Sequence, residues 1–208
     1  MHFALYFILK CFILIVLILG GPNAEVYRNG KGFFSLNVQV IRNTENYILD
    51  IVSRWPGSTH DSHMFRNSFI QQRFKNNEFD NAVLIGDSAY PLSNYLMTPL
   101  ANPITPAEDL YNRSHISTRT IVERTIGIWK RRFAVLTMGL RCKTELAQKI
   151  IVVTAILHNI AVLNRDEIVN FENNVANNEA NPIGLPDHRN PVNNHVQQTY
   201  INYFQTLL

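Results

Sequence analysis

The sequence predicts an α/β domain whose sheet mixes antiparallel and parallel strands. Three observations predict it: an alternating pair of segments around residue 40, a short apolar run that ends in an aspartate, and two long helical stretches in the second half. The chain has 208 residues, 46% of them apolar and 17% charged, which is enough for one sizeable core. This composition excludes collagen-like, disulfide-dense and wholly disordered proteins. We divide the chain into residues 1–19, 20–164 and 165–208.

Residues 1–19 form an apolar segment in which only His2 and Lys10 are not apolar. The segment approaches the ~20 residues that cross a bilayer, but Lys10 lies near its centre. As a signal peptide it has a weak basic start and no good small-residue cleavage site. Residues 11–19, rich in Ile, Leu and Val, also have the composition of a buried strand. An atypical first strand, a membrane segment and a signal-like segment all remain open on these grounds.

The next elements are a β-hairpin, a helix and a buried strand. Residues 34–40 alternate apolar and polar side chains, residues 47–55 resemble a partner strand, and residues 42–46 form the turn between them. Ser58 and Asp61 have the spacing of a capping pair, which predicts a helix from there to about Lys75. Residues 82–85 form a short apolar run before Gly86-Asp87, as in a buried strand that carries a carboxylate at its end.

Residues 91–109 are interrupted by proline, and we expect a loop with a short helix there. Two long helices follow, each with one apolar stripe that predicts core packing. The first stripe comprises Val122, Ile126, Trp129, Phe133 and Leu136, and the second comprises Leu146, Ile150, Val153, Leu157 and Ile160. Residues 165–208 are rich in asparagine without sustained periodicity, which predicts a disordered tail.

Charge and cysteine content narrow the class of function. Residues 111–143 contain eight Lys or Arg and one acid, Glu123, which suits a polyanion, although solvated helix faces also carry such runs. The two cysteines give no disulfide framework and no zinc signature. His60 and His63 lack cysteine partners at zinc spacing, and we interpret them as residues at the start of a helix.

Three carboxylates are candidates for chemistry. Asp87 stands where open α/β sheets place ligands, but an aspartate in a Gly-Asp-Ser sequence also forms turns. Glu123 shares a helix face with Arg119, Gly127 and Lys130, and the alternative is a solvated glutamate paired with arginine. Asp61, the third, is also explained by the preference of carboxylates for helix N-termini.

Two converging carboxylates beside a basic face would suit Mg²⁺, which binds oxygen ligands together with substrate phosphates. Two such ions can clamp the attacking and leaving oxygens of a phosphodiester. That arrangement usually needs a further carboxylate.

Three motifs, in order and at matching intervals, resemble the PIF/Harbinger transposases and the domesticated Harbinger-derived nucleases. They are RWPGSTHDS at residues 54–62, IGDSAYP at residues 85–91 and VERTIGIWKRRF at residues 122–133. The LHNI sequence at residues 157–160 resembles the closing helix of the family. The resemblance covers about residues 20–164. It implies an RNase H-like fold with helices flanking a mixed sheet, and a DDE catalytic triad that binds Mg²⁺ or Mn²⁺.

By this resemblance Asp87 and Glu123, with 35 residues between them, are the second and third members of the triad and metal ligands. Asp61 matches a motif position outside the usual triad, so it is a further candidate ligand with an open role. Arg119, Lys130, Arg131 and Arg132 would contact the DNA backbone. The resemblance also implies a separate Myb-like partner protein for DNA recognition and a nuclear location.

The chain departs from the family at the first triad position. The family places that aspartate on the first strand, in an Asp-(Gly/Cys)-Thr-His motif, whereas Lys10 falls near the expected position here. A lysine there would oppose a dication, and the upstream helical region of the family is also absent from the sequence. We therefore expect a truncated or degraded copy of a metal-dependent nuclease domain, or a gene model with a wrong 5′ end, and we expect this chain to cleave DNA poorly or not at all. The alternatives are a non-catalytic DNA- or protein-binding remnant and a protein anchored to a membrane through residues 1–19.

Overall fold

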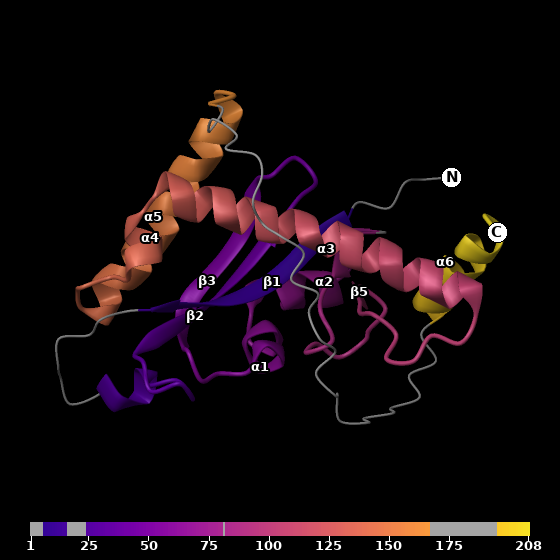
Figure 1. Cartoon of the computed structure of the whole chain (residues 1–208), viewed down its shortest axis with the longest axis horizontal. Coiled ribbons are helices and arrows are strands. Elements are labelled where there is room, and N and C mark those ends of the chain that lie inside the picture. The colour runs from indigo at the N-terminus through magenta and orange to yellow at the C-terminus, as the bar shows by residue number, and fades with distance from the viewer. Residues whose placement is uncertain (1–5, 16–23, 81, 167–194) are drawn as a thin grey trace.

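The computed structural model describes residues 6–15, 24–80, 82–166 and 195–208. Its centre is a five-stranded sheet in the order β3-β2-β1-β4-β5 (Figure 1). β1 (Tyr6–Ile15), β2 (Ser35–Arg42) and β3 (Ile48–Pro56) are antiparallel, while β4 (Val83–Ile85) and β5 (Leu96–Met97) continue the sheet parallel to β1. A 3₁₀ turn, η1 (Ala24–Tyr27), precedes β2. This mixed sheet agrees with the RNase H-like α/β fold that the motifs imply.

The N-terminal apolar segment supplies the central strand. β1 pairs with β2 from Ile8 to Ile15 and with β4 from Tyr6 to Ile8, so both its edges are hydrogen-bonded. The strand therefore begins earlier than the predicted residues 11–19, of which residues 16–19 lie outside the described residues. Of the three interpretations of this segment, a strand is the conformation that its described residues adopt.

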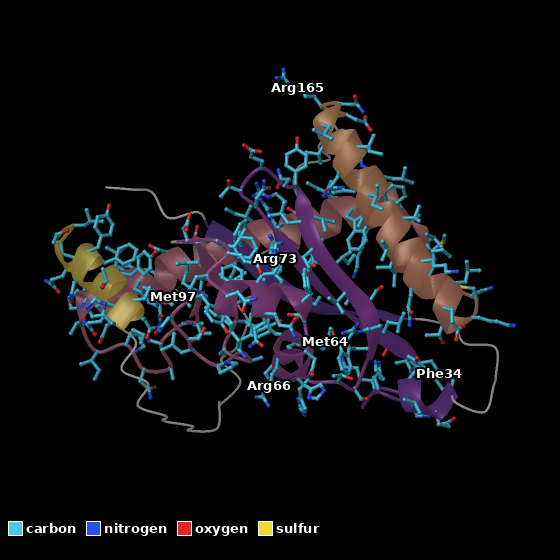
Figure 2. The ribbon with its side chains drawn as sticks, turned by 180° about the vertical axis from the view of Figure 1, so that it is seen from behind. Phe34, Met64, Arg66, Arg73, Met97 and Arg165 are labelled. Carbon is cyan, nitrogen blue, oxygen red and sulfur yellow. The ribbon has the colours of Figure 1, made fainter. Side chains whose placement is uncertain are left out.

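Helices cover both faces of the sheet. α1 (Asp61–Arg66) and α2 (Phe69–Lys75) pack Met64, Phe65 and Phe74 against one face. α3 (Pro106–Arg132) crosses the other face, where Val122 and Ile126 meet Ile8 of β1 (Figure 1). Figure 2 views the molecule from behind, with Met64 and Arg66 labelled beside α1. The amino-terminal part of β1 and the adjoining β4 thus lie beneath α3.

α4 (Val135–Met138) and α5 (Thr144–Leu163) complete the second face. The first predicted stripe is confirmed, because Val122, Trp129 and Leu136 are buried. The second was wrong: Leu146, Val153, Leu157 and Ile160 are exposed, and Ile150 is only partly buried. The core side of α5 instead comprises Thr144, Ala147, Ile151, Thr154, Ala155 and His158. Since α5 is apolar on both sides, periodicity alone could not identify the side that faces the sheet.

Three further expectations need correction. The predicted helix to Lys75 is broken at Asn67-Ser68, where Ser68 Oγ caps α2, and the N-cap of α1 is His60 rather than Ser58. The proline-rich region contains the short strand β5. α6 (His195–Gln205) lies in the segment predicted to be disordered and packs Ile201 against Tyr111 of α3, while residues 167–194 lie outside the described residues.

Among the described helices, α5 alone is long and apolar enough to cross a membrane. One side of it nevertheless packs against β2 and β3, with Ala147, Ile151 and Ala155 in the same cluster as Leu36 and Val40. Core helices often meet the same criteria of length and composition.

Four polar residues fix the turn of the β2–β3 hairpin to α3 and α5. We call them the hairpin cluster: Arg42, Asn46, Thr125 and Asn159. Arg42 is fully buried and donates to Ile121 O (2.8 Å) and Thr125 Oγ1. Thr125 Oγ1 also donates to Asn46 Oδ1 (3.0 Å). The Asn159 amide donates to Ile48 O (2.7 Å) and accepts from Ile48 N–H (2.9 Å). The LHNI motif therefore has a structural role here.

Candidate active site

Asp87 follows β4 in a turn that its own side chain builds. Its Oδ1 accepts from Ala89 N–H (3.0 Å), while its backbone carbonyl accepts from Tyr90 N–H (3.1 Å). Gly86 has no room for a side chain, because a Cβ there would lie 3.0 Å from both Leu96 and Tyr90. The turn uses Asp87 Oδ1, whereas Oδ2 faces Arg119. The Gly-Asp-Ser turn is therefore compatible with a functional role for Asp87.

Asp87 and Glu123 meet at one cation, Arg119. Arg119 Nη2 lies 3.8 Å from Asp87 Oδ2 and 4.0 Å from Glu123 Oε1. The side chains of Asp87 and Arg119 are 18% and 19% exposed, whereas that of Glu123 is 54% exposed. Residues four apart share a helix face, which explains the pairing of Arg119 with Glu123. We call Asp87, Arg119 and Glu123 the carboxylate site; it joins the end of β4 to the middle of α3.

His115, one turn before Arg119 on α3, is the residue near this site that sequence reasoning missed. It is buried, and its Nε2 lies 3.2 Å from Met97 O of β5. Burial, with a smaller contribution from the charge of Arg119 and against the hydrogen bond to Met97, lowers the pKa of His115 to about 4. The imidazole is therefore neutral near pH 7. The only sequence signal was its four-residue spacing from Arg119 on the helix.

Space beside Glu123 is open. A Cβ added to Gly127, one turn further along α3, would meet nothing within 4 Å. Lys130, also on this face by its spacing from Glu123, is half-buried, and burial lowers its pKa. A phosphate backbone could therefore approach α3 along this face.

The other predicted basic residues are spread around α3. Successive residues on a helix are ~100° apart, so Lys130, Arg131 and Arg132 cannot all point to one side. Arg131 is exposed, whereas Arg132 forms an ion pair with Asp166 and donates to its backbone carbonyl (2.9 Å). Contact of these three side chains with DNA remains a prediction.

Asp61 lies on a different part of the molecule. It begins α1, and its Oδ1 accepts from Asn37 Nδ2 (2.9 Å), which also donates to Thr59 O. Gly57 allows this loop to lie against β2, because a Cβ there would be 1.9 Å from Ser35 Oγ. The RWPGSTHDS motif thus holds a loop against the end of the sheet, and the described contacts of Asp61 are with this loop and β2 rather than with Asp87 or Glu123.

The sheet register gives the place of Lys10. The parallel pairing of β1 and β4 ends at Ile8 and Ile85, and Lys10 and Asp87 each follow this last pair by two residues. Lys10 also pairs with Val40 of β2, which puts it on the central strand. Lys10 is therefore the residue of β1 that comes as far beyond the last pair as Asp87 does after β4.

The described residues do not fit a two-ion metal centre. Asp87 and Glu123 offer the oxygen donors that Mg²⁺ prefers, but Arg119 lies between them. No group of three His, Cys, Asp or Glu side chains in the described part of the chain could hold a metal ion. The residue of β1 that follows the last β1–β4 pair by two residues, as Asp87 does after β4, is Lys10 rather than a third carboxylate.

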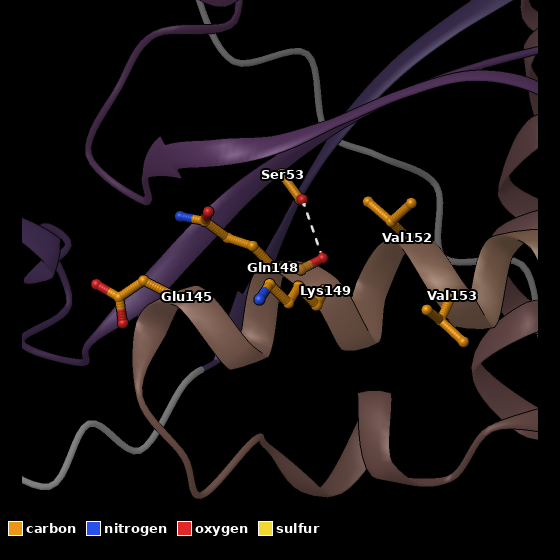
Figure 3. Close-up of a pocket in the computed structure, with 6 residues that line it drawn as sticks. All are labelled: Ser53, Glu145, Gln148, Lys149, Val152 and Val153. Carbon is orange, nitrogen blue, oxygen red and sulfur yellow. Dashed lines mark hydrogen bonds between the residues drawn. The ribbon is translucent and has the colours of Figure 1, made fainter.

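A hollow of about 390 Å³ opens elsewhere, beside α5 and β3 (Figure 3). It is lined by Ser53, Glu145, Gln148, Lys149, Val152 and Val153, with Ser53 Oγ donating to Gln148 O (3.4 Å). None of the three residues of the carboxylate site lines it. Although four of its six lining residues are polar, the atoms that they expose in the hollow are mostly apolar. We therefore place the candidate active site at Asp87 and Glu123.

Comparison with known proteins identifies the family. Residues 19–159 match the model of the DDE superfamily endonuclease domain. HARBI1 of Rattus norvegicus is 35% identical over 146 residues, covering 68% of this chain and 42% of the relative. HARBI1 of Homo sapiens is 34% identical over the same length and shares, and the ALP1-like protein of Arabidopsis thaliana is 24% identical over 162 residues, covering 70% and 40%.

The chain spans less than half the length of these curated relatives. No solved structure matches it. The family match begins after β1 ends, so Lys10 lies outside the matched region, whereas Asp87 and Glu123 lie inside it. Endonucleases of this superfamily generally depend on a divalent metal and act on nucleic acid. The chain belongs to the DDE superfamily endonucleases and contains a nuclease-like domain of the Harbinger-derived type.

Proposed function

We propose that this domain binds the DNA backbone along the Arg119–Lys130 face of α3 and cleaves phosphodiesters weakly or not at all. The observation that carries the proposal is that Lys10 and Asp87 each follow by two residues the last pair of β1 and β4, Ile8 and Ile85. Phosphodiester cleavage by two metal ions needs a cluster of anionic ligands. Lys10 stands in the sequence near the place where the family has its first triad aspartate, so this chain has a cationic residue in place of an anionic ligand.

The same charges favour binding of a polyanion. Arg119 already neutralises part of the charge of Asp87 and Glu123, and Lys130 adds a second cation on the same face. Gly127 leaves the surface between them open. Phosphate contacts from such side chains position a protein on DNA without reading its sequence. Target recognition would then require a separate protein, for which a Myb-like partner is our proposal, and DNA binding would place the chain in the nucleus.

DNA binding is tested by measuring affinity for labelled duplex DNA across a series of salt concentrations. Lys130→Gln should weaken binding several-fold and reduce the salt slope by ~1, because each neutralised phosphate releases about one counterion. Lys75→Gln, an exposed lysine of α2 on the opposite face of the sheet, is the matched control. Binding that ignores ionic strength, or equal losses in both variants, would contradict the proposal.

Cleavage is tested with the same duplex and Mg²⁺ or Mn²⁺. The unmodified chain should release no more product than Asp87→Asn or Glu123→Gln. Asp87→Asn keeps an oxygen for the turn to Ala89 N–H, so it isolates the charge from the local fold. Robust cutting by the unmodified chain that both substitutions abolish would show a complete catalytic centre and overturn this part of the proposal.

A further inference from the structure

α5 carries an exposed apolar stripe opposite its core face. Its six members are 45–66% exposed: Leu146, Val153, Ile156, Leu157, Ile160 and Leu163. The spacings of seven, three, one, three and three residues keep all six on one side of the helix. Soluble proteins seldom leave so long a row of large aliphatic side chains in contact with water without a partner.

The area of this stripe is sufficient for a specific interface. Six aliphatic side chains, each about half exposed, present ~600 Å² per copy, and two copies together exceed the ~1,000 Å² that a biological interface needs. The hollow beside β3 adjoins the stripe at Val152 and Val153 and could receive side chains from a partner (Figure 3). The repeat of three and four residues is the pattern with which helices pack side by side.

Charges at the two ends of α5 favour one orientation. Glu145 is exposed in the first turn, and Arg165 is exposed just beyond the last turn, where Figure 2 labels it. In a parallel pair each of these side chains would face the same side chain of the other copy, and the repulsion between like charges is unfavourable. In an antiparallel pair centred between Thr154 and Ala155, Glu145 of one copy would lie opposite Asn164 of the other and next to its Arg165, and the exposed Lys149 would lie opposite Ile160.

We propose that a second copy of this chain covers the stripe, with α5 packed antiparallel against α5 across a two-fold axis. Such an interface is isologous, because the same patch serves both copies. Val153 of one copy then lies opposite Ile156 of the other, and Leu146 lies opposite Leu163. The dimer leaves the carboxylate site unobstructed, since Glu123 and Arg119 belong to α3 and do not contribute to the stripe.

The mass of the full chain in solution tests the proposal. Light scattering after gel filtration should give a dimer at ~100 μM, and Val153→Glu and Leu157→Glu should each give a monomer, because a buried charge at an apolar interface is costly. Ile104→Glu, which replaces an 88% exposed aliphatic before α3, should remain dimeric. Far-UV circular dichroism should be the same for all four proteins. A monomer at the highest concentration, or loss of the dimer in Ile104→Glu, would overturn the proposal.

Disulfide cross-linking tests the orientation, in a background with Cys11 and Cys142 replaced by serine. Mixed Leu146→Cys and Leu163→Cys proteins should form a heterodimeric disulfide, whereas Leu146→Cys alone should not cross-link to itself. Self-cross-linking of Leu146→Cys would show a parallel pair and contradict the model. A monomer that floats with phospholipid vesicles would assign the stripe to a lipid surface and overturn the dimer.

Discussion

Two polar regions meet on α3, and they are built in opposite ways. In the carboxylate site, charges face a partly open surface, and Glu123 is about half exposed. The hairpin cluster meets α3 at Thr125, two residues after Glu123. There the Arg42 guanidinium of β2 is completely buried and hydrogen-bonded to backbone and hydroxyl oxygens. Burial lowers the pKa of Arg42 to about 10, which leaves it charged at neutral pH. The first region is arranged for an external partner and the second for holding β2, β3, α3 and α5 together.

The contrast predicts that substitutions in the two regions separate stability from binding. The largest effect should come from Asn159→Ala, which removes both hydrogen bonds to the buried Ile48 backbone. We expect the free energy of unfolding to fall by ~2–4 kcal/mol, because a buried donor and acceptor lose their partners. Urea denaturation measures this change.

The control for that experiment is Asn164→Ala, whose side chain donates only to Ile160 O within the exposed end of α5. It should cost well under 1 kcal/mol. DNA affinity per folded molecule should be the same in both variants. Equal stability of the two variants would contradict the structural role given to Asn159.

A second, smaller effect concerns His115, behind the carboxylate site. The pKa of His115 is about 4 in the folded chain against an ordinary value of 6.5, so the unfolded chain binds more protons between these values. Stability should therefore be lost as the pH falls from 6.5 to 4, by ~2 kcal/mol from this residue. The loss should be smaller in His115→Gln.

Urea denaturation at a series of pH values measures this difference. His158, whose pKa is also lowered by burial, contributes in the same direction to both proteins and cancels in the comparison. Parallel pH profiles for the two proteins would show that His115 is not buried as a neutral imidazole.

The smallest effect should be at Gly127, on the open side of Glu123. Gly127→Ala should raise the free energy of unfolding by ~0.5–1 kcal/mol, since alanine favours the helix and the added Cβ meets nothing. The same methyl group should weaken DNA binding by partly filling the surface along which the backbone would approach. A destabilised variant would mean that the space beside Gly127 is occupied in solution.

The sequence predicted the parts of this fold that local patterns define. Alternation identified the β2–β3 hairpin, and the apolar run before Gly86 identified β4 with Asp87 at its end. The motifs selected Asp87 and Glu123, which the fold brings together at Arg119.

The remaining features depend on tertiary contacts that local patterns do not contain. α5 is apolar on both sides, so only packing against β2 and β3 decides which side is buried. β5 has two residues, too few to show a period, and α6 is a polar segment ordered against α3. His115 lies seven residues before the buried Val122 and so on the same side of α3, but the apolar stripe that marks this side begins only at Val122.

The central claim is that Lys10, near the place of the family's first triad aspartate, prevents this chain from assembling a metal centre. Titration with Mn²⁺, followed by electron paramagnetic resonance of the free ion, tests it in the unmodified chain and in Lys10→Asp. We predict binding at least ~10-fold tighter in Lys10→Asp, a gain that the added Asp87→Asn substitution abolishes, because a third carboxylate would complete the oxygen ligands. Equally tight binding by the unmodified chain, dependent on Asp87 and Glu123, would contradict the account.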